Sequence, residues 1–261
     1  MAGGVLAVFA HPDDESLLAG GVLAACASSG RRVAIVSMTR GERGPSELPE
    51  LRGRPALADV REAELRAAAH ALGASAAECL DYPDGELAGA DERQAAHALA
   101  ALLRRERPEA VISFSEEGLY WHPDHLAVAR FLLGALELLG NGGAPAWLYG
   151  ATWPEGHAGR LVSLVSARGL SADLWGIVPD AFGAPADSIT ISLDVRRFLP
   201  AKLSALRGYA SQLGPGHLLS TLPDDLAEEF LGREYFVRLR PENPQRDWLA
   251  EALAKSGSGA G

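Results

Sequence analysis

The chain has 261 residues, of which 48% are hydrophobic and 22% charged, and this ordinary balance excludes a wholly disordered protein. Its 34 acidic residues and 24 lysines and arginines give a formal net charge of −10, and such a negative field repels nucleic acid and anionic membranes. No apolar run has the length of a bilayer span, and the first residues lack the features of a signal peptide. We therefore expect a cytoplasmic protein without a nucleic-acid or membrane partner.

Strands and helices alternate along the first half of the chain. Short, continuous apolar runs, typical of strands covered on both faces of a parallel sheet, occupy residues 5–10, 33–36 and 111–114. Apolar residues at helical spacing predict helices over residues 17–26, 56–72, 91–105 and 127–139. The alternation predicts an α/β fold with a Rossmann-like, doubly wound, mostly parallel sheet flanked by helices. In such sheets ligands bind at the carboxyl ends of the strands.

The second half of the chain is less regular. Ile189, Ile191 and Leu193 alternate with Ser and Thr, which predicts a half-exposed strand near an edge of the sheet. A helical period follows over residues 199–213. Because no linker divides the chain, we expect one domain over residues 1–261, with a mobile loop over residues 40–55 and a flexible tail over residues 256–261.

Two polar clusters follow two of the predicted strands. The first strand leads directly into His11-Pro12-Asp13-Asp14-Glu15, and the strand over residues 111–114 leads into a loop that ends in His122-Pro123-Asp124-His125. Both clusters therefore lie at strand carboxyl ends, where a doubly wound sheet gathers its ligands. An aspartate in each cluster is also a favoured helix N-cap, and this purely structural interpretation is the alternative.

The residue types in these clusters indicate a metal site. Imidazole nitrogen and carboxylate oxygen suit Zn²⁺, which in catalytic sites takes three protein ligands and leaves one position for water. Of the neighbours Asp13 and Asp14, one can bind the metal while the other acts as a general base toward the water. The histidines at positions 122 and 125 can likewise divide into a metal ligand and an electrophile near the reacting carbonyl.

These motifs identify a family. With Ala10–Glu15 behind a strand and Gly118–His125 before a helix, the chain resembles the zinc-dependent LmbE-like N-deacetylases, which include the phosphatidylinositol N-acetylglucosamine deacetylases and the mycothiol and bacillithiol deacetylases. Weaker matches support the resemblance and lie at residues 39–44, 61–64, 83–85, 202 and 211–212. The resemblance covers almost the whole chain and implies the LmbE-like fold.

The resemblance also implies a role for each matching residue. It assigns zinc to His11, Asp14 and His125 and the general base to Asp13. The remaining residues that it implies assist the reaction or bind the substrate. They are His122, which assists the carbonyl oxygen or the leaving amine; Asp124, which orients His122; Tyr120, which polarises the amide carbonyl; and Arg61 and Asp84, which contact sugar hydroxyls.

We therefore expect a zinc-dependent hydrolase that deacetylates an N-acetylglucosamine-type small molecule: a glucosaminyl-inositol or glucosaminyl-malate thiol precursor, or an antibiotic amino sugar. The alternatives are an amidase of mycothiol or bacillithiol S-conjugates, a non-haem iron enzyme with a two-histidine, one-carboxylate site, and a non-catalytic sugar-binding module. A homo-oligomer is in keeping with the size and fold class.

Overall fold

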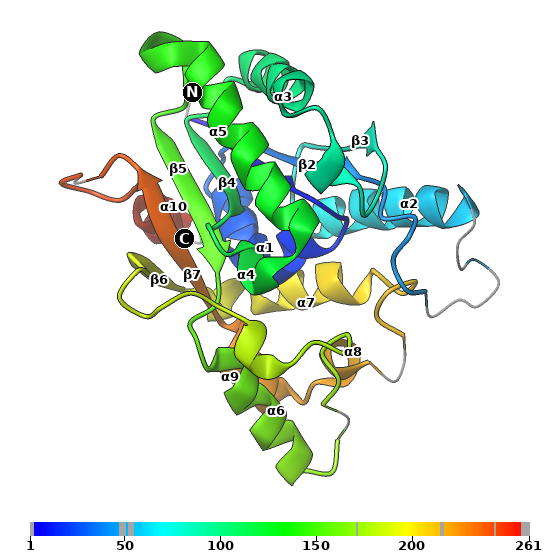
Figure 1. Cartoon of the computed structure of the whole chain (residues 1–261). Coiled ribbons are helices and arrows are strands. Elements are labelled where there is room, and N and C mark those ends of the chain that lie inside the picture. The colour runs from blue at the N-terminus through cyan, green and yellow to red at the C-terminus, as the bar shows by residue number, and fades with distance from the viewer. Residues whose placement is uncertain are drawn as a thin grey trace.

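A seven-stranded β-sheet runs through the middle of the molecule (Figure 1). The computed structural model describes residues 3–46, 51, 55–170, 172–214, 217–242 and 244–256. The strand order is β3-β2-β1-β4-β5-β7-β6; the first five are parallel, and β7 is antiparallel to both of its neighbours. The strands span Val5–Phe9 (β1), Val33–Thr39 (β2), Ala76–Tyr82 (β3), Ala110–Phe114 (β4), Trp147–Thr152 (β5), Ile191–Asp194 (β6) and Arg233–Arg240 (β7).

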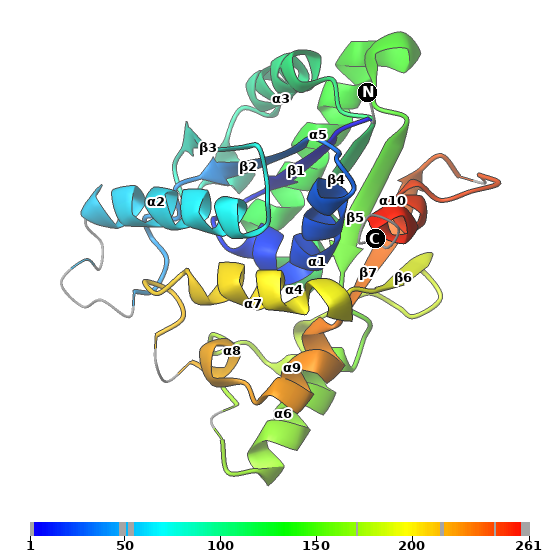
Figure 2. The ribbon, with the colours of Figure 1, turned by 180° about the vertical axis from the view of Figure 1, so that it is seen from behind.

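Helices cover both faces of the sheet, as the pattern of the sequence predicts. On one face lie α3 (Glu92–Glu106) and α5 (Pro123–Gly143), and on the other lie α1 (Asp14–Ser28), α2 (Pro55–Ala71), α7 (Leu199–Arg207) and α10 (Trp248–Ser256) (Figures 1 and 2). Of the remaining helices, α4 (Gly118–Trp121) follows β4 and α6 (His157–Ala167) follows β5, whereas α8 (Leu218–Thr221) and α9 (Asp224–Leu231) connect α7 to β7. The predicted α/β class and doubly wound architecture are confirmed.

The burial of each strand explains its sequence pattern. Every residue of β1, β2, β4 and β5 is buried, because helices cover both faces, and their apolar runs are therefore continuous. In β6 buried and exposed residues alternate, and this strand lies at the edge of the sheet, as predicted. The helix expected over residues 199–213 is too long, because α7 ends at Arg207 and the chain then forms turns through Gly214.

Two predictions of mobility fall partly outside the described residues. Residues 47–50 and 52–54 of the expected loop and residues 257–261 of the expected tail are not among them. Ser256, the first residue of that tail, instead ends α10 and is buried. Among the helices of the described ranges, none combines the length and hydropathy that a bilayer crossing requires.

The order of the strands places the two polar clusters side by side. Strands β1 and β4 are parallel neighbours, with Val5 opposite Ala110 and Ala7 opposite Ile112. Helix α1 follows β1 onto one face of the sheet, and α5 follows β4 onto the other (Figures 1 and 2). The chain thus diverges to opposite faces at this point, which opens a crevice at the carboxyl ends of the two strands.

A buried ion pair joins α1, α7 and β7. Lys202 Nζ lies 2.7 Å from Glu234 Oε1, and both side chains are almost fully buried. The Glu234 carboxylate also accepts hydrogen bonds from the main-chain N–H groups of Gly21 and Val22, at 2.7 and 2.8 Å. A Cβ atom at position 21 would lie only 2.6 Å from Val195, so glycine allows this close approach.

We expect Lys202→Met to destabilise the protein by about 3–5 kcal/mol, because it leaves the Glu234 carboxylate buried without its counter-charge. The measurement is the free energy of unfolding in urea. The matched control is Lys255→Met, since Lys255 is the only other lysine in the sequence and is exposed on α10. We expect the control to change stability by less than about 0.5 kcal/mol. An equal effect of the two changes would contradict the prediction.

Candidate active site

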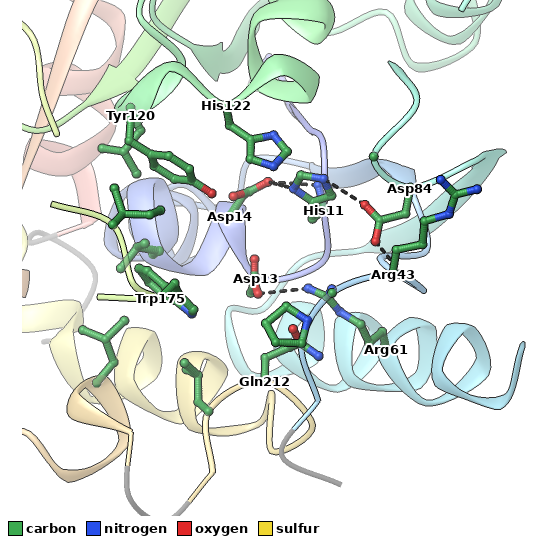
Figure 3. A pocket seen from close by; sticks show the side chains of 18 of the residues that line it. His11, Asp13, Asp14, Arg43, Arg61, Asp84, Tyr120, His122, Trp175 and Gln212 are labelled. Carbon is green, nitrogen blue, oxygen red and sulfur yellow. Dashed lines mark hydrogen bonds and ion pairs between the residues drawn. The ribbon is translucent and has the colours of Figure 1, made fainter. Parts of the chain in front are cut away.

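A cavity of about 340 Å³ lies at the carboxyl ends of β1 and β4 (Figure 3). Its lining includes His11, Asp13 and Asp14 from the first polar cluster and Tyr120 and His122 from the second. Residues with positive φ concentrate here: Asp13 (119°) lies in the first cluster, and Leu119 (69°) and Trp121 (63°) lie in the loop that leads into the second. Non-glycine residues rarely adopt such angles unless the surrounding structure imposes them, so both loops are held in strained conformations.

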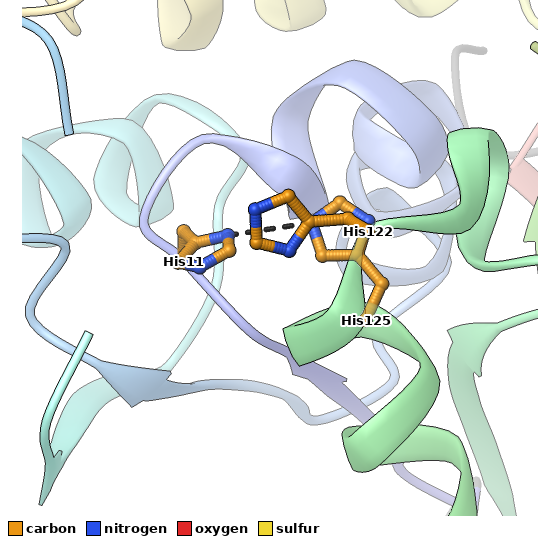
Figure 4. A group of neighbouring side chains, drawn as sticks. All are labelled: His11, His122 and His125. Atoms are coloured by element: carbon orange, nitrogen blue, oxygen red, sulfur yellow. Dashed lines mark hydrogen bonds between the residues drawn. The ribbon is translucent and has the colours of Figure 1, made fainter. Parts of the chain in front are cut away.

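Hydrogen bonds orient the two histidine rings toward each other. His11 Nε2 lies 3.2 Å from Asp84 Oδ1 and 3.3 Å from Asp124 Oδ2, while His125 Nδ1 lies 2.8 Å from the carbonyl oxygen of Gly118. These partners accept hydrogen bonds, so each ring carries its proton on the nitrogen that faces them. The other nitrogens, His11 Nδ1 and His125 Nε2, face each other at 3.3 Å (Figure 4).

Asp14 completes a triangle of donor atoms. Its Oδ2 lies 3.5 Å from His11 Nδ1, and its Oδ1 lies 3.5 Å from His125 Nε2. Ligands about 2.0–2.1 Å from a tetrahedral zinc ion are separated from one another by about 3.4 Å. Two nitrogens 3.3 Å apart, each with a different oxygen of the Asp14 carboxylate at 3.5 Å, therefore suit a divalent metal ion of this type.

Two further groupings surround His11. Its ring, with those of His122 and His125, offers nitrogens that all lie within 4.8 Å of one another, and so do the ligand atoms of His11, Asp84 and Asp124. In the second group the carboxylates contact Nε2 of His11, the nitrogen that faces away from His125. Asp84 and Asp124 thus stand behind the donor triangle, where carboxylates fix the orientation of a metal-binding histidine.

The electrostatics of the triangle suit cation binding. Burial lowers the pKa of His125 to about 4, which keeps its ring neutral. Burial alone would raise the pKa of Asp14, but the neighbouring His125 and His11 lower it to about 2. Burial likewise opposes the protonated form of His11, yet hydrogen bonds with Asp124, Asp14 and Asp84 raise its pKa well above the usual value. The pocket therefore favours a positive charge on the His11 ring itself.

Asp13 lies beside the triangle and is held by Arg61. It occupies the N-cap position of α1, but its side chain makes no capping hydrogen bond, so the capping interpretation is wrong for this residue. The Arg61 guanidinium is 3% exposed and donates hydrogen bonds to Asp13 Oδ2 (3.0 Å), to the carbonyl oxygen of Pro12 (2.6 Å) and to that of Gly41 (2.8 Å). Arg61 is thus a buried residue of the site.

The pKa of Asp13 is raised to about 7. Burial raises it most, the positive charge of Arg61 lowers it, and the negative charge of Asp14 raises it. A carboxyl group with a pKa near neutral pH can both accept and release a proton, as a general base in hydrolysis must.

A second contact to Asp13 comes from Glu15 of the same polar cluster, which is held in turn by a residue that the sequence analysis does not single out. Glu15 Oε2 accepts a hydrogen bond from the main-chain N–H of Asp13 at 3.2 Å, and Glu15 Oε1 accepts one from the Tyr209 hydroxyl at 2.6 Å. Both side chains are buried. Tyr209 lies in the turn after α7, and its distance from the motif along the chain hides this role from a reading of the sequence.

The turn that carries Tyr120 and His122 contributes hydrogen-bond donors. Burial raises the pKa of Tyr120, so its hydroxyl stays protonated; its ring centroid lies 5.1 Å from that of His125. His122 Nδ1 accepts a hydrogen bond from the main-chain N–H of Asp124 at 3.2 Å. Burial lowers the pKa of His122, and its neutral ring therefore carries the proton on Nε2.

Asp124, which is expected to orient His122, contacts it through its main-chain N–H, while its carboxylate has other partners. That carboxylate accepts hydrogen bonds from the main-chain N–H groups of Gly85 (2.8 Å) and Leu87 (3.0 Å) and contacts His11. Its side chain therefore positions His11 and the turn after β3, and only its main chain contacts His122. The Asp124 side chain also does not cap helix α5, because the N–H groups that donate to it belong to Gly85 and Leu87, outside that helix.

Asp84 belongs to the same network and lines the cavity. Besides its contact with His11, it accepts a hydrogen bond from the main-chain N–H of Arg43 at 2.7 Å through Oδ2. The side chain is buried, and although burial opposes ionisation, the His11 contact contributes most to lowering its pKa to about 2. Asp84 therefore does not only form the turn after β3, because its carboxylate also contacts His11 at the cavity.

The fold and this site define a class: a doubly wound α/β protein with a group of histidines and carboxylates that could hold a metal ion at its switch-point crevice. Comparison with known proteins gives the family. The profile described as "PIG-L: GlcNAc-PI de-N-acetylase" matches residues 6–136. The chain is 32% identical over 269 residues to the 1D-myo-inositol 2-acetamido-2-deoxy-alpha-D-glucopyranoside deacetylase of Thermomonospora curvata, covering 90% of each protein. The chain therefore belongs to the PIG-L family, as its motifs indicate.

Solved structures agree on the fold. A conserved protein of Thermus thermophilus superposes with a TM-score of 0.62 at 26% identity, covering 93% of this chain and 97% of that one. The N,N'-diacetylchitobiose deacetylase of Pyrococcus horikoshii gives a TM-score of 0.65 at 20% identity, covering 92% and 87%. A 4-carboxy-2-hydroxymuconate hydratase of Pseudomonas putida gives 0.63 at 21%, covering 94% and 99%, so the fold alone does not decide the reaction.

We expect Tyr209→Phe to destabilise the protein by about 1–3 kcal/mol, because the buried Glu15 carboxylate loses a hydrogen-bond donor. The free energy of unfolding measures this loss. Tyr235→Phe, in the half-buried middle of β7, is the matched control and should cost less than about 0.5 kcal/mol. If the two changes cost the same, the Tyr209–Glu15 contact does not support the Asp13 loop.

Proposed function

We propose that this protein is a zinc-dependent hydrolase that removes the acetyl group from an N-acetylglucosamine-type substrate. The observation that carries the proposal is the triangle of His11 Nδ1, Asp14 and His125 Nε2, with Asp13 beside it. The names of the relatives support the substrate class, since two proteins of similar sequence are named 1D-myo-inositol 2-acetamido-2-deoxy-alpha-D-glucopyranoside deacetylase.

In this proposal His11, Asp14 and His125 hold the metal. A zinc ion bound there lowers the pKa of a water ligand to about 7 and polarises a carbonyl group. The residues behind the triangle, Asp84 and Asp124, keep the proton of His11 on Nε2, so that Nδ1 remains available as a ligand.

The remaining side chains act on the substrate and on the water. Asp13 accepts a proton from the attacking water at Oδ1, because its Oδ2 faces Arg61. The Tyr120 hydroxyl and the His122 Nε2–H donate hydrogen bonds to the carbonyl oxygen as negative charge develops on it. The C–N bond then breaks, the amine receives the proton that Asp13 accepted, and acetate leaves.

Residues that line the same cavity supply the proposed contacts with the substrate. Arg61 and Asp84 line it and contact sugar hydroxyls in the proposal, in addition to their contacts with Asp13 and His11. We also propose a cytoplasmic enzyme of one domain that acts on a small amino sugar. A homo-oligomer remains a prediction from size and fold class.

We expect the zinc-loaded protein to release acetate from N-acetylglucosaminides, and Asp13→Asn to lower kcat by about 10²–10⁴-fold while leaving the bound zinc unchanged. Acetate release and metal content per chain are the measurements. The control Asp59→Asn, at an exposed position of α2, should keep full activity. Acetate release by Asp13→Asn at the wild-type rate would remove Asp13 as the base, and no release by the wild type would overturn the proposed function.

We expect His125→Ala to abolish stoichiometric zinc binding, because it removes one of the three ligands that the proposal assigns to the metal. Zinc content after dialysis is the measurement. The control is His97→Ala, since His97 is exposed on α3 and distant in sequence from both clusters. Wild-type zinc content in His125→Ala would refute the ligand assignment.

A further inference from the structure

The turn that carries Tyr120 and His122 has an unusual backbone. Within α4, Leu119 has a φ of 69° and a ψ of −49°, and Tyr120 has a φ of −146° and a ψ of 33°, so neither residue is helical. A backbone with a positive φ at a leucine persists only where the surrounding structure holds it. The direction of the Tyr120 side chain therefore depends on the contacts of this turn.

One set of contacts comes from the loop between α6 and β6. The main-chain N–H of Gly183 donates a hydrogen bond of 2.7 Å to the carbonyl oxygen of Leu119, the residue before Tyr120. The ring of Phe182 is buried, and its centroid lies 5.1 Å from that of the Tyr120 ring. Two adjacent residues of this loop thus contact both the main chain and the side chain of the turn.

The same loop is fixed to the end of β5. The main-chain N–H of Ala184 donates to the carbonyl oxygen of Trp153 at 2.8 Å, and that of Glu155 donates to the carbonyl oxygen of Ala184 at 2.9 Å. The Phe182 ring stacks on the Trp153 ring, with centroids 5.7 Å apart. Because β5 is a buried strand, the loop connects the turn to the sheet.

The backbone at position 183 requires glycine. Gly183 has a φ of 102°, and a Cβ atom there would lie 2.7 Å from the carbonyl oxygen of Trp153. Alanine at this position must therefore move the loop away from β5. The hydrogen bond to Leu119 would move with it.

The beginning of the turn has separate contacts. The buried Glu117 carboxylate accepts hydrogen bonds from the hydroxyl groups of Ser115 and Thr152. The main-chain N–H of Gly118 donates to the carbonyl oxygen of Ser115 at 3.0 Å, and the carbonyl oxygen of Gly118 accepts the hydrogen bond from His125. The position of His125 is thus fixed without the loop before β6, and this loop acts on the rest of the turn.

The Tyr120 side chain points into the cavity, with its hydroxyl toward Asp14 (Figure 3). In the proposed mechanism this hydroxyl donates a hydrogen bond to the amide oxygen as negative charge develops there. Such a donor lowers the barrier only when it is already in place, and a displacement of about 1 Å can cost a large part of its effect.

We propose that Gly183 and Phe182 are positioning residues that hold the Tyr120 hydroxyl where the amide oxygen acquires its charge. This proposal rests on the proposed amide hydrolysis and deepens it. Neither residue lines the cavity, so both act on the reaction through Tyr120.

The test is the kcat of the zinc-loaded protein for an N-acetylglucosaminide, with Gly183→Ala alone and combined with Tyr120→Phe. We expect Gly183→Ala to lower kcat by about tenfold or more, with KM and zinc content unchanged, because the displaced donor acts in the transition state. In the Tyr120→Phe protein the same change should lower kcat by less than about twofold, since the hydroxyl that it displaces is absent.

Gly169→Ala is the matched control. Gly169 also has a positive φ, 70°, but no atom lies within 4 Å of a Cβ atom built there, so the change introduces the same backbone strain without moving a neighbour. It should leave kcat unchanged. A second variant, Phe182→Leu, keeps an apolar side chain and removes the ring, and it provides the same double-mutant comparison if Gly183→Ala does not fold.

Two outcomes overturn the proposal and leave the proposed deacetylase intact. Equal losses of kcat with and without the Tyr120 hydroxyl would show that the loop acts on the stability of the site in general. An unchanged kcat in both Gly183→Ala and Phe182→Leu would show that Tyr120 keeps its position without the loop.

A spectroscopic measurement separates this proposal from the proposed function. The chain has five tyrosines, and in protein made with 3-fluorotyrosine the fluorine resonance of Tyr120 is assigned by its loss in Tyr120→Phe. We expect this resonance to shift in Gly183→Ala and not in Gly169→Ala. If the protein releases no acetate, the proposed function fails, and the resonance still decides: a shift supports the positioning of Tyr120 by the loop, and an unshifted resonance overturns it.

Discussion

The contact of His11 Nε2 with the carboxylates of Asp84 and Asp124 is the interaction on which the site depends. These contacts fix the ring so that its Nδ1 faces His125 Nε2 at 3.3 Å, beside the carboxylate of Asp14. They also raise the pKa of His11, so the site favours a positive charge at this point. A metal ion bound as proposed would take the place of that proton, and Asp13 lies beside it.

Holding these groups together has a free-energy cost that the rest of the fold offsets. Asp13 adopts a φ of 119°, which Arg61 and Glu15 stabilise through hydrogen bonds from opposite sides. The two residues come from α2 and α1, and the extensive apolar core under both helices keeps them in place. The strained backbone of Asp13 therefore depends on the packing of α1 and α2 against the sheet. A shift of either helix would break a hydrogen bond that holds the Asp13 loop in this conformation.

The sequence predicted which residues meet at the candidate site, but not which residues hold them in place through hydrogen bonds. His11, Asp14 and His125 were expected to meet because each follows a strand in a motif, and neighbouring parallel strands bring their carboxyl ends to one edge. The partners of the Asp124 carboxylate were not predicted, because a motif shows which residues are neighbours in the chain and not which main-chain groups a carboxylate reaches across the fold. The same limit hides Tyr209, which reaches Glu15 from the turn after α7.

The sequence by itself determined the fold class, the edge position of β6 and the residue types at the carboxyl ends of β1 and β4, since these follow from local periodicity and short motifs. Only the tertiary structure decided that Arg61 is buried against Asp13, that Asp84 contacts His11, and that the loop before β6 contacts the turn that carries Tyr120. The physical reason is that these contacts join segments far apart in the chain, and their partners depend on how helices and loops pack over the crevice.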